Sequence, residues 1–181
     1  FIADFGKHLR TNSPNFRADP RPVGGSMFRI YRDVRFSRDK SPYKTSAAAR
    51  FPHLRANMDV HAPGFYIHLE PGDCVGGGGL WHPDPAALKK VRDQIVARPR
   101  EWKAVRAAGF ALDGDSLKRV PTGYDPSHPF AEDLKMKDLY TMTRFTEKDV
   151  YAPDFLDRFV DACRTAAPLM KFLTRTLGLP W

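Results

Sequence analysis

The chain has 181 residues, of which 42% are hydrophobic, and this is enough to fill the core of one domain. It has no apolar run near the roughly 20 residues that cross a bilayer and no signal-peptide pattern at its start, so we expect a cytoplasmic protein without membrane contact. The two cysteines, Cys74 and Cys163, are too few for a disulfide framework and lack metal-ligand spacing, which agrees with a reducing compartment.

The net charge of +8 is concentrated in the first third of the chain. Residues 1–60 carry twelve Lys and Arg against five Asp and Glu, whereas residues 61–181 carry seventeen against sixteen. An excess confined to one region predicts a surface or site that faces anions, because evenly spread charge would indicate little beyond solubility.

The chain opens with apolar residues at helical spacing, namely Phe1, Ile2, Phe5 and Leu9, which predict a helix. No capping residue stands before them, so we expect the sequence to begin inside a helix and the domain to be incomplete at its N-terminus. Residues 11–26, rich in Asn, Ser, Pro and Gly, predict an irregular connection.

Residues 28–36 predict a strand with apolar side chains on alternate positions. Arg32 interrupts this alternation, and a guanidinium on an apolar face needs a carboxylate or an anion as a partner. Residues 46–63, with Pro52 and Pro63 among polar residues, predict a surface loop.

Residues 64–81 give the clearest hairpin pattern. Phe65, Ile67 and Leu69 alternate with polar positions, and a Pro-Gly-Asp turn follows. The return strand contains the glycine run 76–79, which has no side chains, so we expect a helix, an aromatic residue or a ligand to lie against it.

The second half of the sequence predicts mainly helices. Asp84 and Pro85 start one helix, which ends at Pro99, and a shorter helix follows up to Gly109. Residues 139–145 predict a further strand. The last helix extends from about residue 153 to 177, where Pro168 is expected to kink or split it.

These elements predict a single α+β domain over residues 1–181. Its sheet is mainly antiparallel, with a central hairpin packed against helices that include a long C-terminal helix.

The segment FRIYRDVRFSRDKSPYKT, residues 28–45, is the strongest candidate for a ligand-binding site because it places six basic side chains among apolar and aromatic ones. Arginine forks and lysine charges recognise phosphate and carboxylate groups. The alternative is a solvated surface in which Asp33 and Asp39 neutralise part of the charge. A second basic region, at Lys118 and Arg119, could extend this anion-binding surface. The candidate ligand-binding residues are Arg29, Arg32, Arg35, Lys40, Tyr43, Lys44, Lys118 and Arg119.

His68 and Glu70 lie two residues apart on a predicted strand, so both side chains emerge on one face and could act as acid and base or as metal ligands. Asp33 could supply a third oxygen if its segment lies beside the hairpin, which would give a catalytic group suited to metal-assisted phosphoester chemistry. The alternative is that Glu70 forms a structural ion pair with an arginine.

Several motifs together resemble those of DUF2461, a widespread bacterial and fungal family of unknown function. They are FRIYRDVRFSRDKSPYKT, PGFYIHLEPGD with GGGGLWHPDP, SLKRVPTGYDPSHPF with LKMKD, and APLMKFLTRTLGLPW, and they extend from about Arg21 to Trp181. The resemblance implies no activity. Its motif positions are Arg29, Arg32, Asp33, Arg35, Asp39, Lys40, Tyr43, Lys44, His68, Glu70, Gly72, Lys118, Arg119, Pro121 and Gly123. The family pattern also implies an N-terminal helical part with a Trp-Phe element, which this sequence is expected to lack.

The sequence thus predicts a protein that binds an anionic, phosphate-containing partner, either a small molecule or nucleic acid, on a basic face of the sheet. One alternative is a metal-dependent phosphoester hydrolase that uses Asp33, His68 and Glu70 with a divalent metal ion. Another is a domain without enzymatic activity in which the charged segment is an ion-pair network that fixes the fold. The residue pattern leaves open whether the protein is an enzyme and which cofactor it uses.

Overall fold

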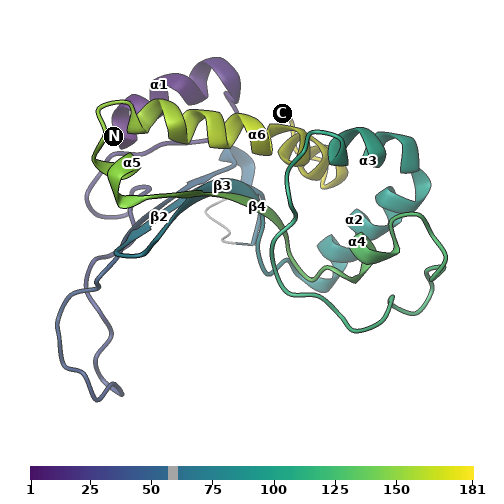
Figure 1. Cartoon of the computed structure of the whole chain (residues 1–181), viewed down its shortest axis with the longest axis horizontal. Helices are drawn as coiled ribbons and strands as arrows, with labels where there is room; N and C mark the ends of the chain where they lie inside the picture. The colour runs from purple at the N-terminus through teal and green to yellow at the C-terminus, as the bar shows by residue number, and fades with distance from the viewer. Residues whose placement is uncertain (57–60) are drawn as a thin grey trace.

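The computed structural model describes residues 1–56 and 61–181 and shows a single α+β domain (Figure 1). Its sheet has four antiparallel strands in the order β1-β2-β3-β4. The strands are β1 (Ala47–Pro52), β2 (Gly64–Glu70), β3 (Asp73–Leu80) and β4 (Leu139–Phe145). The predicted fold class is therefore confirmed, with the hairpin β2-β3 at the centre of the sheet.

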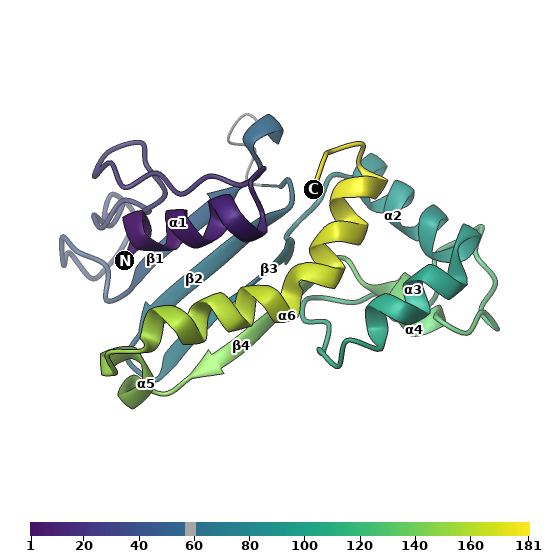
Figure 2. The same ribbon diagram turned by 90° about the horizontal axis from the view of Figure 1, so that it is seen from above.

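Two helices lie along one face of the sheet, and three others form a separate lobe at one end of it (Figures 1 and 2). The first group comprises α1 (Ile2–Asn12) and α6 (Phe155–Thr176), and the short α5 (Glu147–Tyr151) precedes α6. The helical lobe comprises α2 (Pro85–Ala97), α3 (Pro99–Arg106) and α4 (Ala131–Lys135). A 3-10 helix, η1 (Leu54–Ala56), follows β1. None of the described helices has the combined length and apolar character of a membrane span.

The glycine run of β3 allows α6 to approach the sheet closely. A Cβ atom on Gly76 would lie 2.7 Å from Cδ2 of Phe159, and one on Gly78 would lie 2.8 Å from Cδ1 of Phe65. Because real side chains do not tolerate such distances, these positions must lack a Cβ for the helix and strand to pack as they do. A helix and an aromatic residue therefore lie against this side of the run.

Helix α6 joins two parts of the core. Its first half packs on the sheet and α1, with Phe159 and Phe51 fully buried. Its second half packs on the helical lobe, where the rings of Phe172 and Trp102 lie 4.8 Å apart. Pro168 lies inside α6 without splitting it, and Figure 2 shows that the helix axis bends along its length.

The predicted strand over residues 28–36 is absent from the structure. Residues 28–45 instead form a projecting segment, here called the basic arm, which leaves the sheet beside β1 (Figure 1). Its two sides are joined by an isolated bridge between Tyr31 and Tyr43. The apolar alternation predicted a strand wrongly, because no neighbouring strand pairs with this segment along its length and its apolar side chains remain largely exposed.

The predicted loop over residues 46–63 is also wrong in its first part, which forms the edge strand β1. Ala49 and Phe51 point into the core, and small alanines permit close packing there. The strand depends on pairing with β2, which local composition does not reveal. Residues 57–60 of the predicted loop lie outside the described part of the chain.

The remaining predicted elements are present. The N-terminal helix is α1, and the two helices after the hairpin are α2, which Asp84 caps through the amide of Ala87, and α3. Cys74 and Cys163 are both buried free thiols, and burial raises the pKa of Cys163 well above its ordinary value.

Candidate functional site

The side of the sheet opposite α1 and α6 is here called the open face. Four cross-strand neighbours in register define its centre: Arg50, Tyr66, Gly77 and Met142. In Figure 1 this face lies between the basic arm and the helical lobe.

The open face contains a hollow of ≈ 480 Å³. Gly64 and Gly79 pair in register and form part of its floor as bare backbone. A Cβ on Gly79 would lie 2.2 Å from the Cα of Tyr140, so this position of the floor must lack a side chain of its own, and the Arg50 side chain lies over Gly64. The described lining residues are Phe28, Arg50, Ala62, Gly64, Phe65, Tyr66, Val75, Gly79, Trp81, Tyr140 and Met142.

A chain of side-chain contacts extends along β2 from the hollow to the basic arm. The Tyr66 hydroxyl lies 3.3 Å from Nδ1 of His68, and Nε2 of His68 lies 3.3 Å from Oε2 of Glu70. The other carboxylate oxygen of Glu70 accepts a hydrogen bond from the Thr45 hydroxyl at 2.5 Å. His68 and Glu70 are therefore brought together as predicted, and the chain continues to residues on both sides.

The negative charge of Glu70 indicates which atoms donate and which accept in the contacts between Tyr66, His68 and Glu70. The hydrogen bond from Thr45, and then that from His68, hold the pKa of Glu70 below its ordinary value. Since a carboxylate only accepts, Nε2 of His68 is assigned as the donor and Nδ1 as the acceptor for the Tyr66 hydroxyl. Burial, followed by the charge of Asp73, raises the pKa of Tyr66, so its hydroxyl keeps its proton at neutral pH.

Tyr66 was not among the predicted site residues, although a signal for it was present in the sequence. It has the same strand parity as His68 and Glu70, which places its side chain on their face. What the sequence did not reveal was the hollow into which this side chain faces.

Two ion pairs brace the basic arm internally. Asp33 accepts two hydrogen bonds from Nε and Nη2 of Arg35, at 2.9 and 2.6 Å, which lower the pKa of the aspartate. Asp39 pairs with Arg32 and accepts from the hydroxyl and amide of Ser41. Ser41, followed by Arg32, lowers the pKa of Asp39 to about 2.

Three cations of the arm, Arg29, Arg38 and Lys44, form no side-chain hydrogen bond or ion pair within the described residues. Lys40 donates only to the carbonyl oxygen of Val34, at 2.9 Å, which leaves its charge without a carboxylate partner. The arm therefore retains several uncompensated positive charges, and they are distributed along its length.

Aromatic side chains of the arm also face solvent. Phe36 is 96% exposed, and the guanidinium carbon of Arg35 lies 5.9 Å from the centre of its ring. The rings of Tyr31 and Tyr43 lie 5.3 Å apart, and each remains about half exposed.

The other predicted site residues are Asp33, Lys118 and Arg119, which lie on other segments of the chain than His68 and Glu70. Asp33 pairs with Arg35 in the arm, and no group of three His, Cys, Asp or Glu within the described residues could hold a metal ion, so Asp33, His68 and Glu70 do not form such a group. Lys118 and Arg119 lie in the connection between α3 and α4, which Figures 1 and 2 both place at the opposite end of the molecule from the arm.

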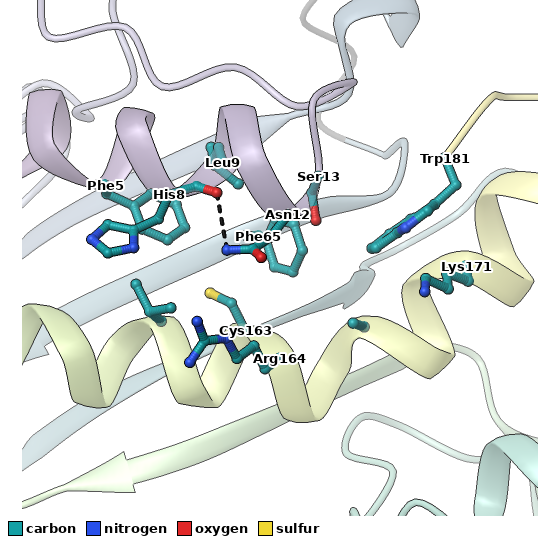
Figure 3. Close-up of a pocket in the computed structure, with 12 residues that line it drawn as sticks. Phe5, His8, Leu9, Asn12, Ser13, Phe65, Cys163, Arg164, Lys171 and Trp181 are labelled. Atoms are coloured by element: carbon teal, nitrogen blue, oxygen red, sulfur yellow. Dashed lines mark hydrogen bonds between the residues drawn. The ribbon is translucent and has the colours of Figure 1, made fainter.

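A second, smaller cavity of ≈ 190 Å³ lies between α1 and α6 (Figure 3). Three of its polar side chains already have partners. Asn12 donates to the carbonyl oxygen of His8 at 3.1 Å, Arg164 pairs with Asp161, and the amine of Lys171 lies 5.3 Å from the centre of the Trp181 ring. This cavity resembles a packing gap between helices more than a ligand site.

Among known proteins, one family resembles this chain over nearly its whole length. The model of the family DUF2461, described as a conserved hypothetical protein, matches residues 1–172, a range that contains α1, the basic arm, the sheet and most of α6. Because the match begins at residue 1, the expectation that the family's N-terminal helical part is lacking finds no support in it. Neither the curated proteins nor the solved structures give a match. Since the family model covers nearly the whole chain, this protein belongs to the DUF2461 family.

Proposed function

We propose that the protein binds single-stranded nucleic acid through the basic arm. The observation that carries this proposal is the arm itself: a projecting segment with six basic residues against two acidic ones and with exposed aromatic rings between them. Nucleic acid offers both a repeated negative charge and flat bases, and the arm offers a partner for each.

The spacing of the charges favours an extended polyanion over a compact anion. A pocket for one phosphate directs several donors to one point, whereas the arm's cations follow an extended chain and two of its arginines already hold carboxylates. Arg29, Arg38 and Lys44 form no side-chain hydrogen bond or ion pair among residues 1–56 and 61–181, so they can contact successive phosphates of a strand.

The exposed rings favour a single strand over a duplex. Bases of a single strand stack on protein aromatic side chains, a contact worth about 1–3 kcal/mol per base. Phe36 exposes nearly its whole ring, and duplex bases are already stacked on one another.

The proposal is tested by fluorescence anisotropy with a labelled single-stranded oligonucleotide at several salt concentrations. A variant with Arg29→Ala, Arg38→Ala and Lys44→Ala removes three charges that form no side-chain hydrogen bond or ion pair within the described residues, while Asp33 keeps its hydrogen bonds from Arg35. We expect weaker binding and a salt dependence of log K whose slope falls by roughly 0.7 for each phosphate that the variant no longer neutralises.

The variant with Lys118→Ala and Arg119→Ala is the matched control, because it removes surface charge at the other end of the molecule and should bind nearly as the wild type does. Phe36→Ala should weaken single-strand binding and leave the salt slope unchanged, since it removes stacking and no charge. Equal affinity and slope for the wild type and the triple variant would refute the proposal.

A further inference from the structure

We propose that the hollow on the open face is a binding site for a flat heteroaromatic ring of the purine nucleoside class, separate from the phosphate-binding surface of the arm. Phe28, the first residue of the arm, lines the hollow, but the site does not depend on nucleic-acid binding by the arm, since none of the arm's charged residues is among the described lining residues.

The shape of the hollow suits a flat ligand. Its floor includes bare backbone at Gly64 and Gly79, and aromatic side chains of Tyr66, Trp81 and Tyr140 surround it. Trp81 is 53% exposed, although its ring lies 6.4 Å from that of His61 and 4.3 Å from that of His82, so apolar ring surface still faces solvent at the rim. Stacking on such rings stabilises planar ligands.

The polar groups of the hollow suit a heterocycle more than a hydrocarbon. Tyr140 lines the hollow, and its hydroxyl has no hydrogen-bond partner among the described residues. Burial, followed by the charges of Asp138, Asp113 and Asp115, raises the pKa of this hydroxyl, so it stays a donor. A heterocycle that reaches the hydroxyl can accept from it through a ring nitrogen or carbonyl oxygen, whereas a hydrocarbon ring cannot.

The charge of the side chains around the hollow also suits a heterocycle. None of its described lining residues carries a carboxylate, and Arg50 is the charged side chain among them. Nη2 of Arg50 donates to the carbonyl oxygen of Ala62 at 2.7 Å, which holds the guanidinium at the wall. Electron-rich ring edges can therefore meet the donors of Arg50 and Tyr140, and no described lining side chain is acidic.

The size of the hollow supports the same class of ligand. Its ≈ 480 Å³ lies within the range of about 300–1,000 Å³ that is typical of small-molecule sites, whereas the ≈ 190 Å³ cavity between α1 and α6 is smaller than that range.

Calorimetric titration of the whole protein with adenosine and with guanosine tests the inference, because neither probe carries a phosphate. We expect saturable binding of at least one nucleoside. Met142→Trp places a larger side chain in the hollow and should weaken binding at least about tenfold, which corresponds to about 1.4 kcal/mol. Ala167→Met, in the cavity between α1 and α6, is the control and should leave affinity unchanged.

Two further variants separate a loss of nucleoside binding from a loss of folding and from binding by the arm. Tyr140→Phe retains the ring and removes the hydroxyl, so it should weaken nucleoside binding without lowering the melting temperature. The Arg29, Arg38 and Lys44 triple alanine variant should bind nucleosides as the wild type does even if it loses oligonucleotides. Absence of saturable binding to the wild type, or unchanged affinity in Met142→Trp, would overturn the inference, as would loss of nucleoside binding in the arm variant.

Discussion

The hydroxyl of Thr45 donates a 2.5 Å hydrogen bond to the carboxylate of Glu70, and this contact ties the end of the basic arm to the open face of the sheet. Thr45 is the last residue of the arm, and Glu70 is the last residue of β2. The same carboxylate holds His68, so the contact also joins the arm to the chain of polar side chains that reaches the hollow.

Thr45→Val should raise the pKa of Glu70 toward its ordinary value, because the hydrogen bond from Thr45 is the largest cause of its lowering. The stability that Glu70 contributes is present above its unfolded-state pKa and is lost as the pH falls through its lower folded-state pKa, so the variant should lose part of it. Carbon NMR titration of the side-chain carboxyl measures the shift. Ser46→Ala is the control, and an unchanged Glu70 pKa in Thr45→Val would contradict the assignment.

Gly76→Ala should lower the free energy of unfolding by about 1–3 kcal/mol, since the added Cβ would lie 2.7 Å from the ring of Phe159. Urea denaturation measures this cost. If the cost arises at that contact, Gly76→Ala combined with Phe159→Leu should be less destabilising than the sum of the two single changes. Additive effects would show that α6 does not press on β3 at this position.

Acidic pH should break the contacts of Asp39 with Ser41 and Arg32. The pKa of Asp39 is lowered from 3.8 to about 2, mainly by hydrogen bonds from Ser41 and then by Arg32. Its contribution to arm stability is therefore complete above pH 3.8 and is lost as the pH falls through about 2. The amide chemical shift of Ser41 should follow this titration. In Asp39→Asn the step should vanish, and a midpoint near 3.8 in the wild type would mean that the contacts do not hold in solution.

Asp133→Ala should destabilise the helical lobe. Its carboxylate accepts a 2.7 Å hydrogen bond from the indole N–H of Trp102, which is fully buried, so the substitution leaves that donor unsatisfied at a cost of about 1–3 kcal/mol. Chemical denaturation measures the loss. The control is Asp161→Ala, which breaks an exposed pair with Arg164 and should change stability by about 0.5 kcal/mol or less.

Trp102→Phe completes this test, because it removes the donor while keeping an aromatic ring in the core. In that background Asp133→Ala should cost less than in the wild type. Equal costs in the two backgrounds would place the stabilising role of Asp133 elsewhere, such as in its contact with Arg106.

The elements that the sequence predicted correctly are those specified by neighbouring residues. The alternation in β2 and the Pro-Gly-Asp turn after it gave the hairpin, and the cap at Asp84 gave the start of α2. The predictions that failed concern pairing between distant segments. Residues 28–36 have strand-like alternation without a strand beside them, and β1 has weak local signals but a complete register with β2.

The sequence by itself determined the four longer helices α1, α2, α3 and α6, the central hairpin, the basic character of residues 28–45 and the shared face of His68 and Glu70, because periodicity, turn chemistry and charge act over a few residues. It did not reveal the short α4 and α5. Only the tertiary structure decided that the basic segment projects as an arm, that α6 fills one side of the glycine run and that a hollow opens on the other side. These features depend on how closely Phe159 and Tyr140 approach β3, which is far from both of them in the sequence. Packing across the whole core sets such distances.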